Sequence, residues 1–407
     1  MKKFVSLAMA GAMALSLAAC GATADSSAGA ATSDTAATAD SASSTASADV
    51  IKIGGIGPLT GATAVYGTAV KNGEELAVKE INAKGGLQFS LQFEDDENDS
   101  EKSINAYNHL KDDGMQILAG PVTTTPTLAV AAEAVADNIF ELTPSASAQA
   151  VIESGDNVFQ VCFTDPNQGV ASADYIADNK LATSVGVIYD SSDAYSNGIF
   201  EKFKPEAESK GLTIVAAEAF TSDNKSDLST QVTKCKDAGA ELIFLPIYYT
   251  EASQVLKYAD SIGYTPKFFG CDGLDGLLAV DGFDTSLAEG VMLLTPFAAD
   301  ATDAKTQDFV AAYKEAYGET PNQFAADAYD VIYSIAQACE AGEVTADMNA
   351  ADICEILKTQ FTSMTFDGLT GTGMTWDASG AVSKAPQAVA IKDGSYVAMT
   401  ASSESAQ

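Results

Sequence analysis

Short apolar runs alternate with amphipathic stretches along most of the chain, starting at Val50. The first run, Val50–Ile56, has the continuous apolar character of a buried strand, and a Gly/Pro turn cluster separates it from a helical pattern. Further strands are predicted at 87–93, 115–119 and 139–142, and helices at 66–83, 100–111 and 125–137. Such repeated strand–helix units predict a parallel sheet that is covered by helices on both faces.

The second half of the chain repeats this rhythm. Strands are predicted at 184–189, 212–220, 242–247, 267–270 and 290–295. Helices are predicted at 195–210, 228–238, 250–262, 304–317 and 322–341, and the residues from 366 onward indicate short strands. The chain is therefore predicted to be an α/β protein with two doubly wound parallel-sheet lobes.

The first 49 residues differ in character from the rest. Lys2 and Lys3 precede an apolar run that ends at Ala19 and is too short for a membrane span, so residues 1–19 are predicted to be a signal peptide. The sequence around Cys20 resembles the bacterial lipobox, in which this cysteine is lipidated; an ordinary signal peptide with an incidental cysteine is the alternative. Residues 20–49 are rich in Ala, Ser and Thr and are expected to form a disordered tether, and 401–407 a short tail.

Charge and residue counts exclude several classes of function. The chain has 22 Lys+Arg against 56 Asp+Glu, a net charge of −34, which argues against binding nucleic acid or anionic lipid. His109 is the only histidine, so a histidine metal cluster is impossible, and it is interpreted as a solvated helix residue. Beyond Cys20, five scattered cysteines lack Cys-x-x-Cys spacing; most are expected to be buried, and a single disulfide stays open.

Two stretches of the sequence partly resemble motifs for calcium or nucleotide binding, but neither has all the residues that its motif requires. The acidic run 94–101 has Ser100 and Ala106 where a calcium-binding EF-hand starting at Asp95 requires Gly and Glu. It is interpreted as a strand end followed by an acidic helix N-terminus. The glycines from Gly54 to Gly61 do not form Gly-x-Gly-x-x-Gly, because Thr60 interrupts the spacing. We therefore predict neither a metal nor a cofactor.

The stretch Gly120–Ser147 carries the strongest sign of a binding site. Two hydroxyl-rich turns, Thr123–Thr125 and Thr143–Ser147, each follow a short apolar strand, and a helical pattern separates them. In an open parallel sheet such turns lie at the carboxyl ends of neighbouring strands, where ligands bind. Hydroxyls and free N–H groups at a helix N-terminus suit a carboxylate, so this stretch predicts a cradle for a small anionic or zwitterionic solute.

A series of motifs extends from the lipobox through both halves of the chain. The motifs are Ile51-Lys-Ile-Gly54, Pro58-Leu-Thr-Gly61, Ile81–Gly86, Gly120–Thr125, Thr143–Ser147 and Gly270-Cys-Asp272-Gly273. Their order resembles that of the solute-binding proteins of branched-chain amino acid ABC transporters. The resemblance implies a type I periplasmic-binding-protein fold with three hinge crossovers between two lobes. The lobes would comprise 50–165 plus 296–374, and 166–295 plus 375–400.

The resemblance also implies the residues of a ligand site between the lobes. Thr124 and Ser147, with their neighbours, would hold the ligand carboxylate and ammonium, and Asp272 would pair with the ammonium where the family often has Glu. Thr124 and Ser147 are expected to contact ligand in an open form, whereas Asp272 engages on closure. The full predicted set is Tyr66, Val122, Thr123, Thr124, Ser145, Ala146, Ser147, Tyr195, Tyr248 and Asp272.

These expectations combine into one functional hypothesis. The protein would be a lipid-anchored, monomeric, non-catalytic receptor on the outer face of the bacterial cell membrane, delivering an amino acid to the permease subunits of an ABC transporter. One alternative keeps the fold and changes the ligand to a short amide, a urea-like compound or another small carboxylate. Another is a ligand-sensing domain for a signalling partner. A secreted hydrolase is disfavoured because no activated nucleophile or metal constellation is recognisable.

Overall fold

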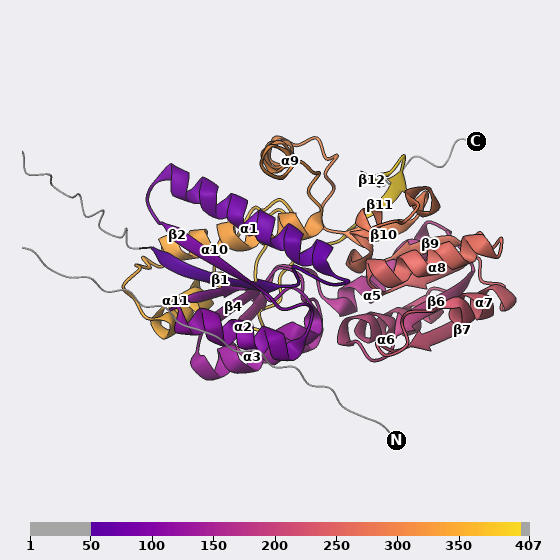
Figure 1. Ribbon diagram of the computed structural model, residues 1–407, viewed down its shortest axis with the longest axis horizontal. Coiled ribbons are helices and arrows are strands. Elements are labelled where there is room, and N and C mark those ends of the chain that lie inside the picture. The colour runs from indigo at the N-terminus through magenta and orange to yellow at the C-terminus, as the bar shows by residue number, and fades with distance from the viewer. Residues whose placement is uncertain (1–49, 400–407) are drawn as a thin grey trace, which may run out of the picture. The chain divides into compact units, whose positions relative to one another are not determined.

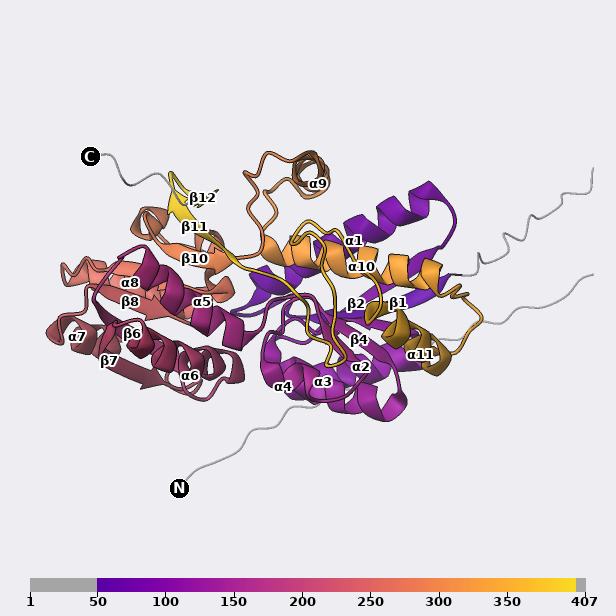
Figure 2. The ribbon, with the colours of Figure 1, turned by 180° about the vertical axis from the view of Figure 1, so that it is seen from behind.

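The computed structural model describes residues 50–399. The predicted signal peptide, Cys20, the predicted tether and the 401–407 tail therefore lie outside the described residues. Within residues 50–399 the chain forms two sheets with helices on both faces of each (Figures 1 and 2). None of the helices in this range has the length and apolar character that a membrane span requires.

The first sheet has five parallel strands in the order β2-β1-β3-β4-β5. They are β1 (Ile51–Gly57), β2 (Phe89–Asp95), β3 (Ile117–Ala119), β4 (Phe140–Thr143) and β5 (Val158–Gln160). One apolar cluster joins a face of this sheet to α1 (Ala64–Lys84), α10 (Gln323–Ala341) and α11 (Ala350–Phe361). A second cluster joins the other face to α2 (Ser100–Asp112) and α3 (Thr124–Asp137), and α4 (Gln149–Ile152) follows β4.

The second sheet has seven strands in the order β12-β11-β10-β9-β8-β6-β7. The strands are β6 (Ser184–Asp190), β7 (Thr213–Phe220), β8 (Leu242–Leu245), β9 (Lys267–Gly270), β10 (Met292–Thr295), β11 (Gln387–Lys392) and β12 (Ser395–Ala398). Helices α5 (Asp165–Asp178) and α6 (Ala194–Ser209) cover one face, and α7 (Ser229–Asp237) and α8 (Tyr249–Ser261) cover the other. The helix α9 (Ala304–Tyr317) lies between β10 and α10 in the chain.

The second sheet is mixed, because β11 and β12 are both antiparallel to their neighbours, a direction that the sequence left unassigned for the short strands after residue 366. The two strands are joined by only two residues, Asp393 and Gly394, whose φ angles of 50° and 71° fit a tight hairpin turn. A two-residue connection can join antiparallel strands only, since a parallel pair needs a long crossover. The α/β class is confirmed, with one parallel and one mixed sheet.

Four of the strands and α-helices, α4, β5, α5 and α11, were not predicted. The helix α5 escaped notice because the face that packs on α6 is built from small residues, Gly169, Ser172 and Ala173, instead of large apolar ones. A Cβ atom on Gly169 would lie 2.5 Å from the carbonyl oxygen of Ile199 in α6, so the two backbones are in close contact. Periodicity of large apolar residues cannot reveal such a helix.

The segment that returns from the first sheet to the second is fastened to α10 by a buried ion pair. The Lys384 ammonium, with a side chain that is fully buried, lies 2.7 Å from the Asp327 carboxylate and donates to the Thr370 hydroxyl. A buried charge is tolerated only when it is paired and hydrogen-bonded, and here both conditions hold. The pair therefore fixes this crossover where it leaves the first sheet.

Several local interpretations are confirmed. Asp99 caps α2 by accepting hydrogen bonds from the backbone N–H groups of Glu101 and Lys102, as expected for an acidic helix N-terminus. His109 is exposed on α2, with its Nδ1 3.0 Å from Glu94. The five cysteines of the described region, Cys162, Cys235, Cys271, Cys339 and Cys354, are all buried and none forms a disulfide.

Glu141 supplies a test of the core of the first sheet. Its side chain is fully buried in β4 without a hydrogen-bond partner, and burial raises its pKa well above the ordinary value. The folded state therefore favours the neutral form of Glu141. Its contribution to the unfolding free energy is complete below about pH 4.3, the pKa of glutamate in the unfolded chain, and is lost as pH rises. Relative to wild type, Glu141→Gln should gain about 1.4 kcal/mol of unfolding free energy per pH unit above that value, measured by urea unfolding.

The matched control is Glu315→Gln, at an exposed position on α9. As an exposed surface substitution, it should leave the unfolding free energy within about 0.5 kcal/mol of the wild-type value at each pH measured. Glu74, a second buried and unpartnered glutamate, titrates in all three proteins and cancels from the comparison. A pH-independent difference for Glu141→Gln would show that Glu141 is charged in the folded state.

Candidate functional site

The site lies at the carboxyl ends of the strands, where the strand order of each parallel array reverses. The reversal falls between β1 and β3 in the first sheet and between β6 and β8 in the second. Ligands of open α/β sheets bind at such points. A cavity of about 20 Å³ lies there, and residues from the ends of both sheets line it. The lining residues are Tyr66, Val122, Thr123, Thr124, Ser145, Tyr195, Tyr248, Asp272, Gly273 and Phe324.

Eight of the ten predicted site residues are in this lining, and two are not. Ala146 and Ser147 are fully buried behind the cavity wall. The Ser147 carbonyl accepts a hydrogen bond of 2.9 Å from the N–H of Asp165, the first residue of α5. Of the two residues whose hydroxyls were predicted to hold the ligand, Thr124 belongs to the cavity lining and Ser147 does not.

The start of α3 presents hydrogen-bond donors to the cavity. Thr124 is the first residue of this helix and is only 2% exposed, and its hydroxyl has no partner within residues 50–399. The N–H groups of a first helical turn have no intrahelical partner either, and the helix dipole adds positive potential there. By contrast, the Ser145 hydroxyl donates to the Val122 carbonyl at 2.6 Å. The α3 N-terminus is therefore the anion-accepting end of the site.

Asp272 is the acidic residue of the cavity lining. It follows β9 and is 5% exposed. Its Oδ1 accepts a hydrogen bond of 2.7 Å from the Tyr195 hydroxyl, and its Oδ2 accepts one of 3.0 Å from Nε2 of Gln168 in α5. The Tyr195 oxygen in turn accepts from the Gly273 N–H at 3.0 Å. These contacts hold the carboxylate in one orientation at the cavity.

Burial and hydrogen bonding have opposite effects on the pKa of Asp272. Removal from water raises the pKa of this carboxyl to about 7, and the donors on Tyr195 and Gln168 limit the rise. Burial likewise raises the pKa of the Tyr66, Tyr195 and Tyr248 hydroxyls well above 10, so all three remain neutral donors at physiological pH. Asp272 is thus the group in the cavity lining whose charge changes near neutral pH.

Aromatic rings form the remaining walls. The rings of Tyr195 and Tyr248 are stacked, with centroids 5.1 Å apart and planes 10° apart. Tyr66 packs edge-on against Tyr248 at 5.6 Å and lies 4.4 Å from the Phe324 ring at the start of α10. Such rings offer apolar contact area together with hydroxyl groups at their edges. A solute with a charged head and an apolar body is the best chemical match to these walls.

Hydrogen bonds between the two sheets' loops close the cavity. The Tyr66 hydroxyl of α1 donates to the Gly273 carbonyl at 2.5 Å, and the Thr250 hydroxyl of α8 donates to the Ala62 carbonyl at 2.7 Å. A volume of about 20 Å³ holds little more than one water molecule. Any larger solute therefore requires the two sets of loops to move apart and these bonds to break.

Gln168, Gly273 and Phe324 were not among the predicted site residues. Gln168 was missed because α5 itself was missed, and nothing in its local sequence marks it. Gly273 adjoins Asp272 in the predicted motif; a Cβ atom there would lie 2.6 Å from the Tyr195 hydroxyl, so glycine is required by contact. Phe324 begins a helix that was predicted, but it reaches the cavity only through the folding of α10 against α1. Within residues 50–399, no group of three or more His, Cys, Asp or Glu side chains is arranged to hold a metal ion.

Comparison with known proteins identifies relatives over the same region. The model of a family described as periplasmic binding protein matches residues 50–395. A Leu/Ile/Val-binding protein homolog from Brucella melitensis is 34% identical over 228 residues, covering 55% of this chain and 61% of that protein. The chain thus aligns with about three fifths of that relative's length.

Two further relatives align over longer stretches. A leucine-, isoleucine-, valine-, threonine- and alanine-binding protein from Pseudomonas aeruginosa is 27% identical over 302 residues, covering 73% of this chain and 80% of that protein. The crystal structure of a branched-chain amino acid transporter substrate-binding protein from Streptococcus pneumoniae, in complex with isoleucine, is 28% identical. It superposes with a TM-score of 0.78 and covers 86% of this chain and 98% of that one.

The support that Gln168 gives to Asp272 can be tested through stability. Gln168→Leu keeps the approximate size of the side chain but removes one donor to the carboxylate and the acceptor for the Asp272 N–H, at 3.2 Å. Leaving buried polar groups without partners should lower the unfolding free energy by about 1–3 kcal/mol in urea denaturation. Asn167→Leu, at an exposed position on the same helix, should change it far less. If Gln168→Leu and Asn167→Leu changed the unfolding free energy equally, the hydrogen bonds between Gln168 and Asp272 would make no net contribution to stability.

Proposed function

We propose, because the chain belongs to the periplasmic binding protein family, that it is an extracytoplasmic receptor which binds an amino acid and delivers it to an ABC permease. The observation that carries the proposal is that one cavity lining contains both the donor groups of Thr124 and the start of α3 and the Asp272 carboxylate. A zwitterion with an apolar side chain complements this arrangement. The ligands for which the relatives are named, branched-chain and other small amino acids, support the same class.

The proposed mechanism begins with capture of the solute in an open cleft. The ligand carboxylate binds the Thr124 hydroxyl and the first N–H groups of α3, which need no rearrangement because they are already unpaired. Closure of the second lobe then brings Asp272 to the ammonium and the Tyr195 and Tyr248 rings over the side chain. Gln168 and the Tyr195 hydroxyl hold the Asp272 carboxylate in position for its contact with the ligand ammonium. Burial of the ligand stabilises the closed form, which is the form that would dock on the permease.

The remaining parts of the hypothesis rest on the sequence. We propose that Cys20 carries the lipid that anchors the receptor, and that residues 20–49 connect this anchor to the body. We also propose that the receptor acts as a monomer without catalysis, with lobes at the boundaries given above. The alternative ligands, a short amide, a urea-like compound or another small carboxylate, are distinguished by the binding experiment that follows.

Removal of the Asp272 carboxylate should weaken binding of an amino acid. Asp272→Ala leaves the ligand ammonium buried without its partner, and we expect a loss of about 2–5 kcal/mol in binding free energy by isothermal titration calorimetry with leucine, isoleucine and valine. Asp281→Ala, at an exposed position in the same loop region, should bind as wild type does. If wild type binds none of the proteinogenic amino acids but binds an amide or a simple carboxylate, the ligand class is wrong.

The pH dependence of binding provides an independent test. In the closed structure without ligand, burial raises the pKa of Asp272 to about 7, so its carboxyl is protonated below this pH and charged above it. Because the ammonium requires the charged form, the dissociation constant should be constant above about pH 8 and should rise about tenfold per pH unit below pH 6. Asp272→Asn should abolish this dependence, although the neighbouring acids Asp165 and Asp193 remain. A slope that persists in the variant would assign the titration to another group.

A further inference from the structure

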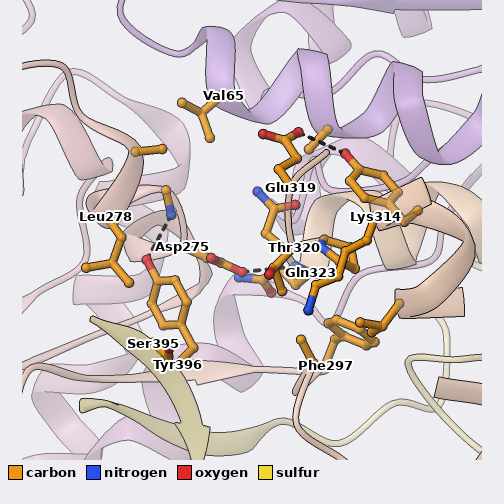
Figure 3. A pocket seen from close by; sticks show the side chains of 18 of the residues that line it. Val65, Asp275, Leu278, Phe297, Lys314, Glu319, Thr320, Gln323, Ser395 and Tyr396 are labelled. Atoms are coloured by element: carbon orange, nitrogen blue, oxygen red, sulfur yellow. Dashed lines mark hydrogen bonds between the residues drawn. The ribbon is translucent and has the colours of Figure 1, made fainter. Parts of the chain in front are cut away.

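A second and much larger cavity, of about 1090 Å³, shares no lining residue with the candidate ligand site (Figure 3). It is bounded by the start of α1, the loop from Asp275 to Ala279, α9 with the segments on either side of it, and the start of β12. Small-molecule sites in proteins typically have volumes of about 300–1,000 Å³. This cavity is therefore large enough for a ligand of drug-like size, which the 20 Å³ cavity is not.

Asp275 forms the floor of this cavity with an unsatisfied carboxylate oxygen. The residue is only 5% exposed, and its Oδ2 accepts a hydrogen bond of 3.0 Å from the backbone N–H of Gln323. Its Oδ1 is buried and has no hydrogen-bond partner within residues 50–399. Figure 3 shows the carboxylate between Tyr396 and Gln323, at the centre of the lining. A buried acceptor without a donor is costly, and a ligand donor that reaches Oδ1 when the carboxylate rotates toward the cavity would remove that cost.

The lining of the cavity is partly apolar and partly charged. Val65, Leu278, Phe297 and Val310 contribute apolar surface. Asp300, Lys314 and Glu319 are exposed charged residues of the same lining. With Asp275 the lining therefore has three acids and one base. The combination of a buried acceptor, apolar walls and an acidic surround selects for a positively charged group attached to an apolar body.

We propose that this cavity is a second binding site, for an organic cation that consists of a primary ammonium on an aliphatic or aromatic body. The ammonium donates to Oδ1 of Asp275, which is the charge-assisted hydrogen bond that the protein itself leaves unmade. The apolar body lies against Phe297, Leu278 and Val310. Because the cavity and the candidate amino-acid site have separate linings, the second site does not depend on the function proposed above.

The test uses 2-phenylethylamine as the probe and 2-phenylethanol as its uncharged counterpart, with binding measured by isothermal titration calorimetry on the full-length protein. Wild type should bind the amine saturably and at least tenfold more tightly than the alcohol. Asp275→Asn preserves an acceptor for the Gln323 N–H but removes the charge, so binding of the amine should fall at least tenfold. Equal binding of the two probes, or an unchanged affinity in Asp275→Asn, would overturn the proposal.

A second variant separates this cavity from the amino-acid site. Thr68→Trp places a large ring in the cavity from an exposed position on α1, and it should abolish binding of the amine. Lys71→Trp, on the same helix but outside the lining, should bind the amine as wild type does. Amine binding that survives in Thr68→Trp would place the probe elsewhere and overturn the proposal, even if Asp275→Asn did not fold.

Discussion

Asp272 is buried at the junction of the two sheets, and a buried carboxylate constrains everything around it because negative charge is costly away from water. The surrounding groups are arranged as donors: the Tyr195 hydroxyl, the Gln168 amide and the Gly273 backbone form one connected set. These groups come from α6, α5 and the loop after β9, so the second sheet must be assembled before the carboxylate is stable. The position of the Tyr195 ring and its close contact with Gly273 serve this hydrogen bonding. The change in the charge of Asp272 near neutral pH is a result of its burial.

Much of the fold could be predicted because most helices and strands have large apolar residues at regular spacing. The bounds of α9 and β9 agree with the prediction at both ends. Prediction failed where packing uses other means. The helix α5 packs through Gly169 and Ser172, and β11 and β12 depend on a two-residue turn at Asp393 whose effect on strand direction is not visible in apolar periodicity. Small-residue contacts and turn geometry are therefore the limits of a pattern of hydrophobic positions.

The residues of the candidate site also divide into those that the sequence could predict and those that it could not. Thr124, Tyr248 and Asp272 could be predicted because each closely follows a strand, in positions where the motif order resembles that of a known family, and the family membership is confirmed. Gln168 and Phe324 reach the cavity from helices whose placement is decided by tertiary packing. No local signal could identify them. Ser147 illustrates the converse, since it lies in the same motif but is absent from the cavity lining, and its backbone carbonyl accepts a hydrogen bond from the Asp165 N–H.

The five buried thiols of the described region have a consequence for the study of motion in this fold. Cys339 and Cys354 lie in helices on the first sheet, Cys235 lies in a helix on the second, and Cys162 and Cys271 follow β5 and β9. A thiol reagent can modify such a side chain only during transient exposure, so its rate of labelling measures the free energy of local opening. Each region thus contains a native reporter, and Cys271, beside Asp272, reports on the loop that would close over a ligand.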